Sequence, residues 1–191
     1  MGMSSKLGFI EHLSRPCVCA HIARPNQSDL ILLDVGLNSE TKAEYLVDFA
    51  KLGALYAKES MKLKQAKIGL LNTGKEKSKG EKEVRKAFDI LSGLESIDFK
   101  GNFEASEIFK SDIDVLVCGG FVGNSIVKFL EALYDALSGR GIKDALLEEY
   151  NYENHGGAIV LGGKGDMIIG HGASSAEANR QMILRTEKIA Q

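Results

Sequence analysis

The residues best suited to chemistry lie in a glycine-rich turn between Cys118 and Ile126. The apolar run from Asp114 to Cys118 is typical of a buried parallel strand. The apolar residues from Ile126 to Leu137 recur at helical spacing and predict a helix over 123–137. Between a strand's carboxyl end and a helix's amino end, free backbone N–H groups and the helix dipole favour a bound anion. The turn therefore predicts a seat for phosphate or a phosphate-bearing group, formed by Gly120, Phe121, Gly123, Asn124 and Ser125.

Two further expected strands end in turns of the same kind. The run LLDVGLN supplies Gly36 and Asn38, and LLNTG supplies Asn72 and Gly74. The carboxyl ends of parallel strands share one edge of a sheet, where ligands bind, so three segments deliver glycines and asparagines to one rim. Each asparagine could hold a ligand's amide or phosphate oxygen, and is equally suited to an Asx turn or a helix cap. Asp34 is equally suited to chemistry and to accepting N–H groups from a neighbouring loop.

The elements that would position these turns alternate between strand and helix. Strands are expected at 17–23, 30–35, 66–71, 97–99 and 114–118, with a last pair at 157–161 and 167–170. Besides 123–137, helices are expected at 7–13, 39–60 with Ser39 as N-cap, 79–91, 104–109, 142–149 and 174–190. This alternation predicts a three-layer α/β/α fold with a mainly parallel sheet, as a single domain over 1–191.

Composition narrows the class of protein. The 191 residues carry 24 Lys and Arg against 26 Asp and Glu, and 44% of them are hydrophobic. This is usual for a globular domain, and the net charge of −2 argues against a nucleic-acid partner. No apolar run approaches the ~20 residues that a membrane span needs. Cys17, Cys19 and Cys118 lack zinc-type spacing and are odd in number, so we expect neither a metal site nor a disulfide framework, and a cytoplasmic location.

In its motifs the chain resembles the carboxyl-terminal half of the PlsX family, the acyl-acyl carrier protein:phosphate acyltransferases. The matching segments, in the family's order, are LLDVGLN, LLNTGKEKSKG, GNFEASEIF, VLVCGGFVGNSIVK, HGGAIVLGG and IIGHGASSAEA. The resemblance implies that inorganic phosphate attacks an acyl thioester on acyl carrier protein or another protein, giving acyl phosphate for phospholipid synthesis. It also implies a fold similar to phosphotransacetylases and isopropylmalate dehydrogenases, no metal or organic cofactor, and a homodimer.

Three departures from the family pattern bear on that implication. The family's amino-terminal half has no counterpart here, and the turn usually written DGFxGN has Gly119 in place of the aspartate. The segment before HGGAIVLGG is short where the family carries an apolar membrane-touching hairpin, so we expect weak or no membrane contact. This shortness favours a sister group, the acetyl-phosphate-forming component C of glycine, sarcosine and betaine reductases. A further alternative is a non-catalytic fragment or subunit that needs a partner for the other half of the cleft.

Phosphate attack on a thioester needs a held phosphate, an oxyanion stabiliser and a proton acceptor. The backbone amides from Phe121 to Asn124 and the Asn124 side chain suit the first two tasks, and Asn72 offers a second side-chain amide. The alternative is a plain helix start with glycine for tight packing. The family motif HGASS implies an acid or base role for His171, beside Gly172 and Ser174. A structural histidine next to an N-cap serine is the alternative there.

Three other features admit both a functional and a structural interpretation. Cys118 is placed as a nucleophile would be, yet a cysteine inside an apolar strand is usually a small buried residue. The basic residues between Lys75 and Lys86 are suited to an acidic carrier protein, yet they alternate with glutamates as a solvated helix face does. The apolar stripe from Phe129 to Leu137 predicts core, and subunit contact wherever it is exposed.

Overall fold

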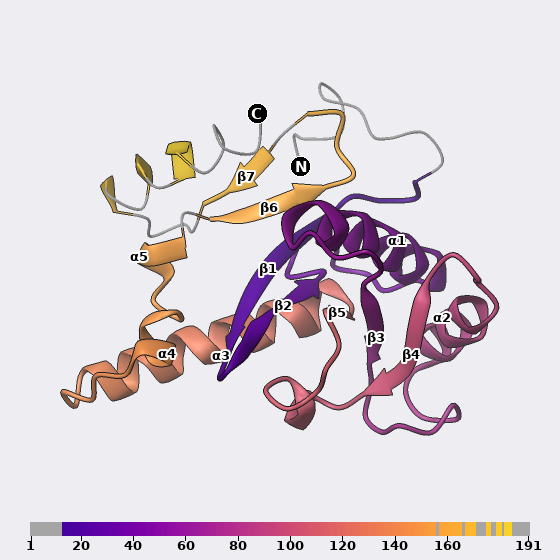
Figure 1. Ribbon diagram of the computed structural model, residues 1–191, viewed down its shortest axis with the longest axis horizontal. Helices are drawn as coiled ribbons and strands as arrows, with labels where there is room; N and C mark the ends of the chain where they lie inside the picture. Colours follow the sequence, from indigo (N-terminus) through magenta and orange to yellow (C-terminus); the bar gives the residue numbers. More distant parts are fainter. Residues whose placement is uncertain are drawn as a thin grey trace.

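The computed structural model describes residues 13–155, 157–165, 167–170, 175–176, 179–180 and 182–184. Its strands form one seven-stranded sheet in the order β4-β3-β5-β2-β1-β6-β7, which crosses the molecule in Figure 1. The strands are β1 (Cys17–Arg24), β2 (Gln27–Leu33), β3 (Lys67–Leu71), β4 (Asp98–Phe103), β5 (Val115–Val117), β6 (Ala158–Leu161) and β7 (Met167–Ile169).

Strand direction divides the sheet into two parts. β4, β3, β5 and β2 are parallel neighbours. β1 is antiparallel to both β2 and β6, and β6 is antiparallel to β7. The strands β2 to β6 therefore run one way and β1 and β7 the other, which confirms the expected mainly parallel sheet. β1 and β2 form a hairpin whose turn places Asn26 at a φ of 58°, the left-handed conformation that short hairpin turns require.

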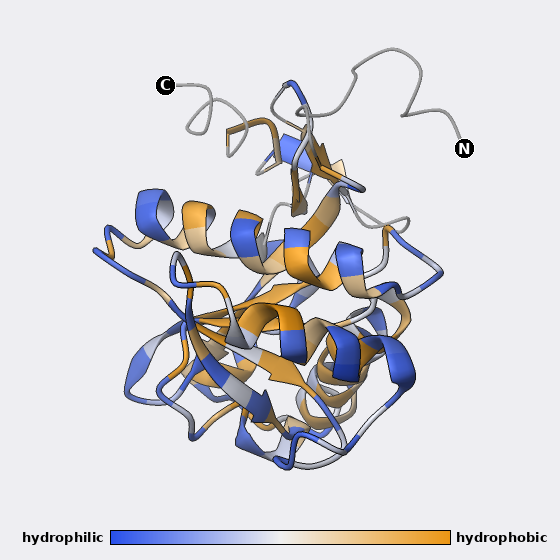
Figure 2. Ribbon diagram, turned by 90° about the vertical axis from the view of Figure 1, so that its right-hand side faces the viewer, coloured by the Kyte–Doolittle hydropathy of each residue, from blue (hydrophilic) through white to orange (hydrophobic). Residues whose placement is uncertain are grey.

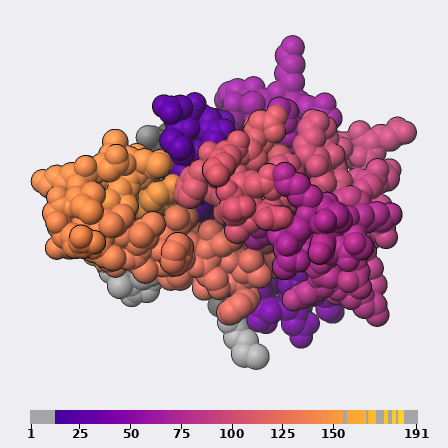
Figure 3. All heavy atoms as spheres, turned by 90° about the horizontal axis from the view of Figure 1, so that it is seen from below, coloured from indigo at the N-terminus to yellow at the C-terminus, as the bar shows by residue number. Residues whose placement is uncertain are grey.

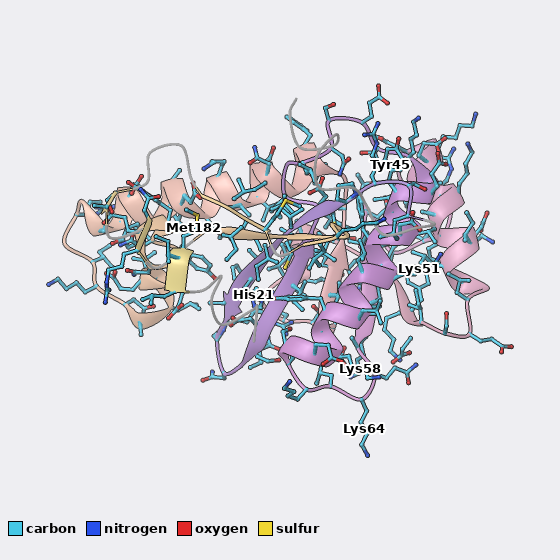
Figure 4. The ribbon with its side chains drawn as sticks, turned by 90° about the horizontal axis from the view of Figure 1, so that it is seen from above. His21, Tyr45, Lys51, Lys58, Lys64 and Met182 are labelled. Carbon is cyan, nitrogen blue, oxygen red and sulfur yellow. The ribbon has the colours of Figure 1, made fainter. Side chains whose placement is uncertain are left out.

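Helices cover both faces of the sheet. On one face lie α1 (Ala43–Ser60) and α2 (Lys82–Ser92), and on the other α3 (Gly120–Ser138) and the short α4 (Ala145–Glu148). Figure 4 shows the molecule from above, with α1, on which Tyr45, Lys51 and Lys58 are labelled, on one side of the strands and α3 on the other. Figure 2 shows mostly hydrophobic strands between helices that carry both hydrophilic and hydrophobic residues. The three-layer α/β/α fold expected from the sequence is confirmed.

The apolar core behind the sheet fixes the strands that carry the site. α1 buries Leu46 and Phe49 against the sheet, at the spacing of one helix face. Burial of such a side chain contributes about 2 kcal/mol. Gly53 allows a close approach, because a Cβ there would lie 2.6 Å from Leu33 Cδ1 and 2.6 Å from Val115 Cγ1. α1 is thus held directly behind β2 and β5.

The start of α1 differs from the expected one. The helix begins at Ala43, with Lys42 as N-cap and no side-chain cap, so the assignment of Ser39 as N-cap is wrong. The carboxylate of Glu83, from α2, accepts the N–H of Ala43 at 3.2 Å. A neighbouring helix therefore supplies the acceptor that a local serine was expected to supply.

Other boundaries shift by a few residues. α2 begins at Lys82, β4 extends to Phe103 and α3 begins at Gly120. The helix expected at 104–109 is the short 3-10 helix η1 (Ala105–Glu107). The helix expected at 142–149 is reduced to α4, whose N-cap Asp144 accepts the N–H groups of Leu146 and Leu147, and a one-turn helix α5 (Tyr152–His155) follows it. All of the expected helix at 7–13 except its last residue, and most of the one at 174–190, lie outside the described residues. Among the described residues, no helix is both long and apolar enough to cross a membrane.

Candidate functional site

The carboxyl ends of β2, β3 and β5 lie side by side at one edge of the sheet. Val117 of β5 is in register with Leu33 of β2 on one side and with Leu70 of β3 on the other. The turns that follow these three strands therefore leave the sheet at the same edge, where α/β proteins of this type bind ligands. The structure thus brings together the three turns that the sequence predicts to converge.

The Asp34 carboxylate organises the turn after β2. It is fully buried and accepts the backbone N–H groups of Val18 at 2.8 Å, Leu37 at 3.2 Å and Asn38 at 2.8 Å. The Asn38 side-chain amide donates to the same carboxylate at 2.9 Å and to the Pro16 carbonyl at 2.9 Å. These donors offset the large cost of burying a charge. Asp34 therefore holds the loop together, and the Asn38 amide is engaged within that network.

The amino end of α3 packs directly on this turn. A Cβ at Gly120 would lie 2.3 Å from the Asn38 carbonyl oxygen and 2.8 Å from Asp34 Oδ2. A Cβ at Gly123 would lie 2.0 Å from the Asp34 carbonyl oxygen. No side chain fits at such distances, so both positions require glycine for packing. The same packing fixes the helix start relative to the Asp34 turn.

The N–H groups available to a ligand differ from those expected. Because α3 begins at Gly120, the Gly123 N–H donates within the helix, to the Gly119 carbonyl at 3.0 Å. The amides that have no acceptor inside the helix are those of its first turn, Gly120, Phe121 and Val122. The expected donor set is therefore displaced toward Gly120. The Ser125 hydroxyl also points back into the helix, where it donates to the Phe121 carbonyl at 2.7 Å.

Asn124 and Gly36 face each other at the mouth of a cavity. A Cβ on Gly36, whose φ is 127°, would lie 3.3 Å from Asn124 Cβ. Both residues line the cavity, and the Asn124 side chain is exposed. Within the described part of the chain its amide makes no hydrogen bond. Asn124 is thus the predicted site residue whose polar atoms remain available to a ligand.

Asn72 has a different arrangement at the end of β3. Its Oδ1 accepts the Thr73 N–H at 2.8 Å, and its Nδ2 donates to the Lys79 carbonyl at 3.1 Å. Gly80 lies against it, since a Cβ there would come within 2.1 Å of Asn72 Oδ1. The side chain therefore closes the loop over 73–80, in which Gly74 is buried beside the Lys79 side chain. This is the loop-closing role that the sequence left open for Asn72.

The remaining predicted residues divide into two groups. Burial, with the nearby Asp34 charge, raises the pKa of the Cys118 thiol far above its ordinary value. Such a thiol is not a ready nucleophile, which favours the structural interpretation of Cys118. His171, Gly172 and Ser174 lie outside the described residues.

Among the described residues, no cluster of three His, Cys, Asp or Glu side chains could hold a metal.

A cavity of about 410 Å³ lies between β1 and α3. Gly36 and Asn124 line it on the side of the rim, and Tyr150 lines it as well. Met182, labelled in Figure 4, also contributes to the lining. Sequence reasoning missed this cavity, because its walls come from β1, α3 and β6, which only the fold brings together. The alternating apolar residues of β1 are the one local signal.

Most of the basic residues after β3 are engaged within the chain. Lys75 pairs with Glu107, Lys77 with Asp89 and Lys86 with Glu83, each at 2.7 Å. Arg85 donates to the Gly80 carbonyl at 2.8 Å. Ion pairs of this exposed kind are typical of a solvated helix face and contribute little stability.

Part of the α3 stripe is exposed. Phe121 is 77% exposed, Phe129 68% and Val122 44%, whereas Leu130 is buried. Seen from below in Figure 3, α3 and the segment after it form much of the surface. Large apolar side chains gathered along one helix face usually mark a contact surface.

The fold of the chain is similar to that of two solved phosphotransacetylases. A phosphotransacetylase from Streptococcus pyogenes superposes with a TM-score of 0.65 at 17% sequence identity, covering 97% of this chain and 57% of that protein. The EutD phosphotransacetylase from Staphylococcus aureus gives a TM-score of 0.58 at 16% identity, over 95% of this chain and 56% of that protein. At these identities the likeness establishes the fold.

Sequence comparison defines the family. Residues 1–145 match the family described as "Fatty acid synthesis protein", and the chain belongs to it. The phosphate acyltransferase of Campylobacter concisus is 34% identical over 204 residues, covering 97% of this chain and 61% of that protein. The phosphate acyltransferase of Prochlorococcus marinus is 37% identical over 191 residues, covering 90% of this chain and 41% of that protein. The chain therefore spans about three fifths or less of the length of these two relatives.

Proposed function

We propose that the chain is the phosphate-binding part of a PlsX-type phosphate acyltransferase, whose acyl donor is a thioester on acyl carrier protein. A phosphate oxygen attacks the thioester carbonyl carbon, and the carbonyl oxygen takes up negative charge. The carbon–sulfur bond then breaks, the acyl phosphate leaves, and the carrier's thiolate takes up a proton. The chain supplies the seat for phosphate and the donors for the developing oxyanion.

The exposed amide of Asn124 is the observation that carries this proposal. It lies at the amino end of α3, one turn from the free N–H groups of Phe121 and Val122. Helix dipole and amides together attract an anion there, and the packing of Gly120 and Gly123 on the Asp34 turn keeps the donors fixed. Fixed donors stabilise charge without reorganising, which is the main source of rate enhancement in acyl transfer. The names of the relatives support the same reaction.

Partners follow from the same proposal. The chain corresponds to the carboxyl-terminal part of such an enzyme, and the rest of the cleft comes from the remaining length of the protein or from a second subunit. Phe121, Val122 and Phe129 support a homodimer formed through α3. The three cysteines are free, which agrees with a cytoplasmic location.

Phosphate binding to the chain tests the proposal directly. Inorganic phosphate is titrated at constant ionic strength while the melting temperature is followed, because a ligand that binds only the folded state raises it. We expect stabilisation by phosphate, and a phosphate Kd at least tenfold weaker in Asn124→Ala, since a hydrogen bond to a charged group contributes about 1.5–3 kcal/mol. Asn154→Ala, an exposed asparagine away from the rim, serves as the control and should bind like the parent. Equal affinity in all three proteins would refute the assignment.

A further inference from the structure

We propose that Thr41, in the loop before α1, is a further phosphate-binding residue, whose hydroxyl donates to an oxygen of the phosphate at the amino end of α3. This inference rests on the proposed function and adds a side chain to its phosphate site. No motif of the sequence marks Thr41, because only the fold brings this loop to the start of α3.

The Thr41 side chain lies against the residue that precedes α3. A Cβ on Gly119 would lie 2.1 Å from Thr41 Oγ1 and 3.3 Å from Thr41 Cβ. The backbone of Gly119 is extended, with a φ of −72° and a ψ of 150°, which any residue can adopt. It is therefore the contact with Thr41, and not the backbone, that requires a glycine at this position. The Thr41 hydroxyl lies in the space that a side chain at residue 119 would fill.

This space is where a helix is ordinarily capped. The side-chain oxygen of an N-cap serine, threonine or aspartate accepts an N–H group of the first helical turn. Gly119 is the N-cap of α3 and provides no such oxygen, and the aspartate of the motif DGFxGN is absent at this position. The first-turn N–H groups of α3 therefore remain available to an oxygen of a ligand.

The Thr41 hydroxyl is available to the same ligand. Within the described part of the chain it makes no hydrogen bond, either to the first turn of α3 or to its own loop. Thr41 is half-buried, so its hydroxyl gains more from a ligand than a fully hydrated one would. A phosphate oxygen can accept from the helix N–H groups and from this hydroxyl together. Such bonds to an ionised acceptor are about twice as strong as bonds between neutral groups.

Thr41 is held in place from both sides. Three residues before it, Asn38 donates its backbone N–H and its side-chain amide to the buried Asp34 carboxylate, at 2.8 and 2.9 Å. Two residues after it, the N–H of Ala43 donates to the Glu83 carboxylate at 3.2 Å. The loop between these anchors is short, so the hydroxyl is positioned before phosphate arrives. Donors positioned in advance stabilise an anion without having to reorganise.

Substitution of Thr41 tests the hydroxyl directly. Inorganic phosphate is titrated into the chain by calorimetry at constant ionic strength. Thr41→Val keeps the shape of the side chain and removes the hydroxyl, so the phosphate Kd should rise about tenfold. Thr41→Ser keeps the hydroxyl and should bind within about twofold of the parent. Ser39→Ala removes an exposed hydroxyl from the same loop and is the matched control. A parental Kd in Thr41→Val would overturn the inference.

Gly119→Ala tests the same hydroxyl without altering Thr41. The new Cβ would lie 2.1 Å from Thr41 Oγ1 and must displace it, so the phosphate Kd should rise about as much as in Thr41→Val. In a Thr41→Ala background the hydroxyl is gone and the remaining contact is the one to Cβ at 3.3 Å. There, Gly119→Ala should change the Kd by less than about twofold. Equal losses in both backgrounds would contradict the proposal, because Gly119→Ala would then act through another group.

Asn124→Ala separates this inference from the proposed function. If phosphate binding depends on Asn124 but is the same in Thr41→Val and the parent, the role of Thr41 is wrong and the proposed function stands. If phosphate does not bind the parent, the proposed function fails, and the role of Thr41 fails with it. If Asn124→Ala and Thr41→Val both bind phosphate more weakly, while Thr41→Ser and Ser39→Ala bind like the parent, both proposals are supported.

Discussion

Asn38 donates both its backbone N–H and its side-chain amide to Oδ2 of Asp34, at 2.8 and 2.9 Å. The other carboxylate oxygen accepts the Val18 N–H from β1. One buried side chain therefore joins β1, the end of β2 and the loop on which α3 rests. Because Gly120 packs against this same carboxylate, any ligand at the start of α3 has its position set by Asp34 without touching it.

Asp34→Asn is expected to destabilise the fold. Each carboxylate oxygen of this fully buried residue accepts N–H groups, so an NH₂ group in place of one oxygen would face those donors with no acceptor between them. The loss should be about 3 kcal/mol in the free energy of unfolding, measured by urea denaturation. Asp135→Asn, an exposed position on α3, should change that free energy by less than about 0.5 kcal/mol. Equal stability of the two variants would show that the Asp34 network is not needed.

Gly123→Ala is expected to displace the amino end of α3. The new Cβ would lie 2.0 Å from the Asp34 carbonyl oxygen and 2.9 Å from Cys118 Sγ, so the helix must shift away from the turn. We expect a loss of about 2 kcal/mol or more in the free energy of unfolding, together with weaker phosphate binding. Gly93→Ala, at the C-cap of α2 with 3.6 Å of clearance and a negative φ, is the control. A Gly123→Ala protein with parental stability would mean that the contact relaxes freely.

Most of the fold follows from local pattern. The apolar runs at Leu30–Leu33, Ile68–Leu70 and Val115–Val117 have the continuous hydrophobicity of strands covered on both faces, and the α1 stripe has helical period. The end of a helix cannot be predicted from local pattern where a residue of another element caps it. The start of α1 is set by Glu83, a residue 40 positions away from Ala43.

In the candidate site, too, some features follow from local pattern and others depend on tertiary contacts. The convergence of three turns follows from strand direction alone, since parallel strands end at one edge. The roles of Asn38, Asn72 and Asn124 cannot be predicted in this way, because the local sequence is similar whether the asparagine amide bonds its own loop or is available to a ligand. The tertiary contacts distinguish them: Asn38 and Asn72 are bonded to their own loops, whereas the Asn124 amide has no hydrogen bond to any residue that the structure describes.

The three thiols should be protected in the folded protein. Cys17, Cys19 and Cys118 are free and buried, and burial raises the pKa of Cys17 and Cys118. Labelling by a disulfide reagent at pH 8 should therefore be slow in buffer and complete in urea. Ser92→Cys, at the exposed end of α2, should add one thiol that reacts at once. Prompt reaction of Cys118 in the parent protein would restore it as a candidate nucleophile.

Ionisation of Tyr150 is expected to lower the free energy of unfolding at alkaline pH. Burial raises the pKa of Tyr150 to about 12, against about 10 in an unfolded chain. Because the folded pKa is the higher one, the stabilisation is complete below pH 10 and is lost as pH rises toward 12. The loss should be roughly 2 kcal/mol, and in Tyr150→Phe this part of the decline should disappear. The variant should also lose about 1 kcal/mol at neutral pH with its bond to Ala23.

Tyr45→Phe provides the comparison for this measurement. The pKa of Tyr45 is lowered, chiefly by its contact with the Arg15 guanidinium, so its ionisation affects stability with the opposite sign. Urea denaturation of both variants and the parent between pH 8 and 12 should therefore show a shallower decline only for Tyr150→Phe. Parallel curves for Tyr150→Phe and the parent would mean that this hydroxyl reaches solvent.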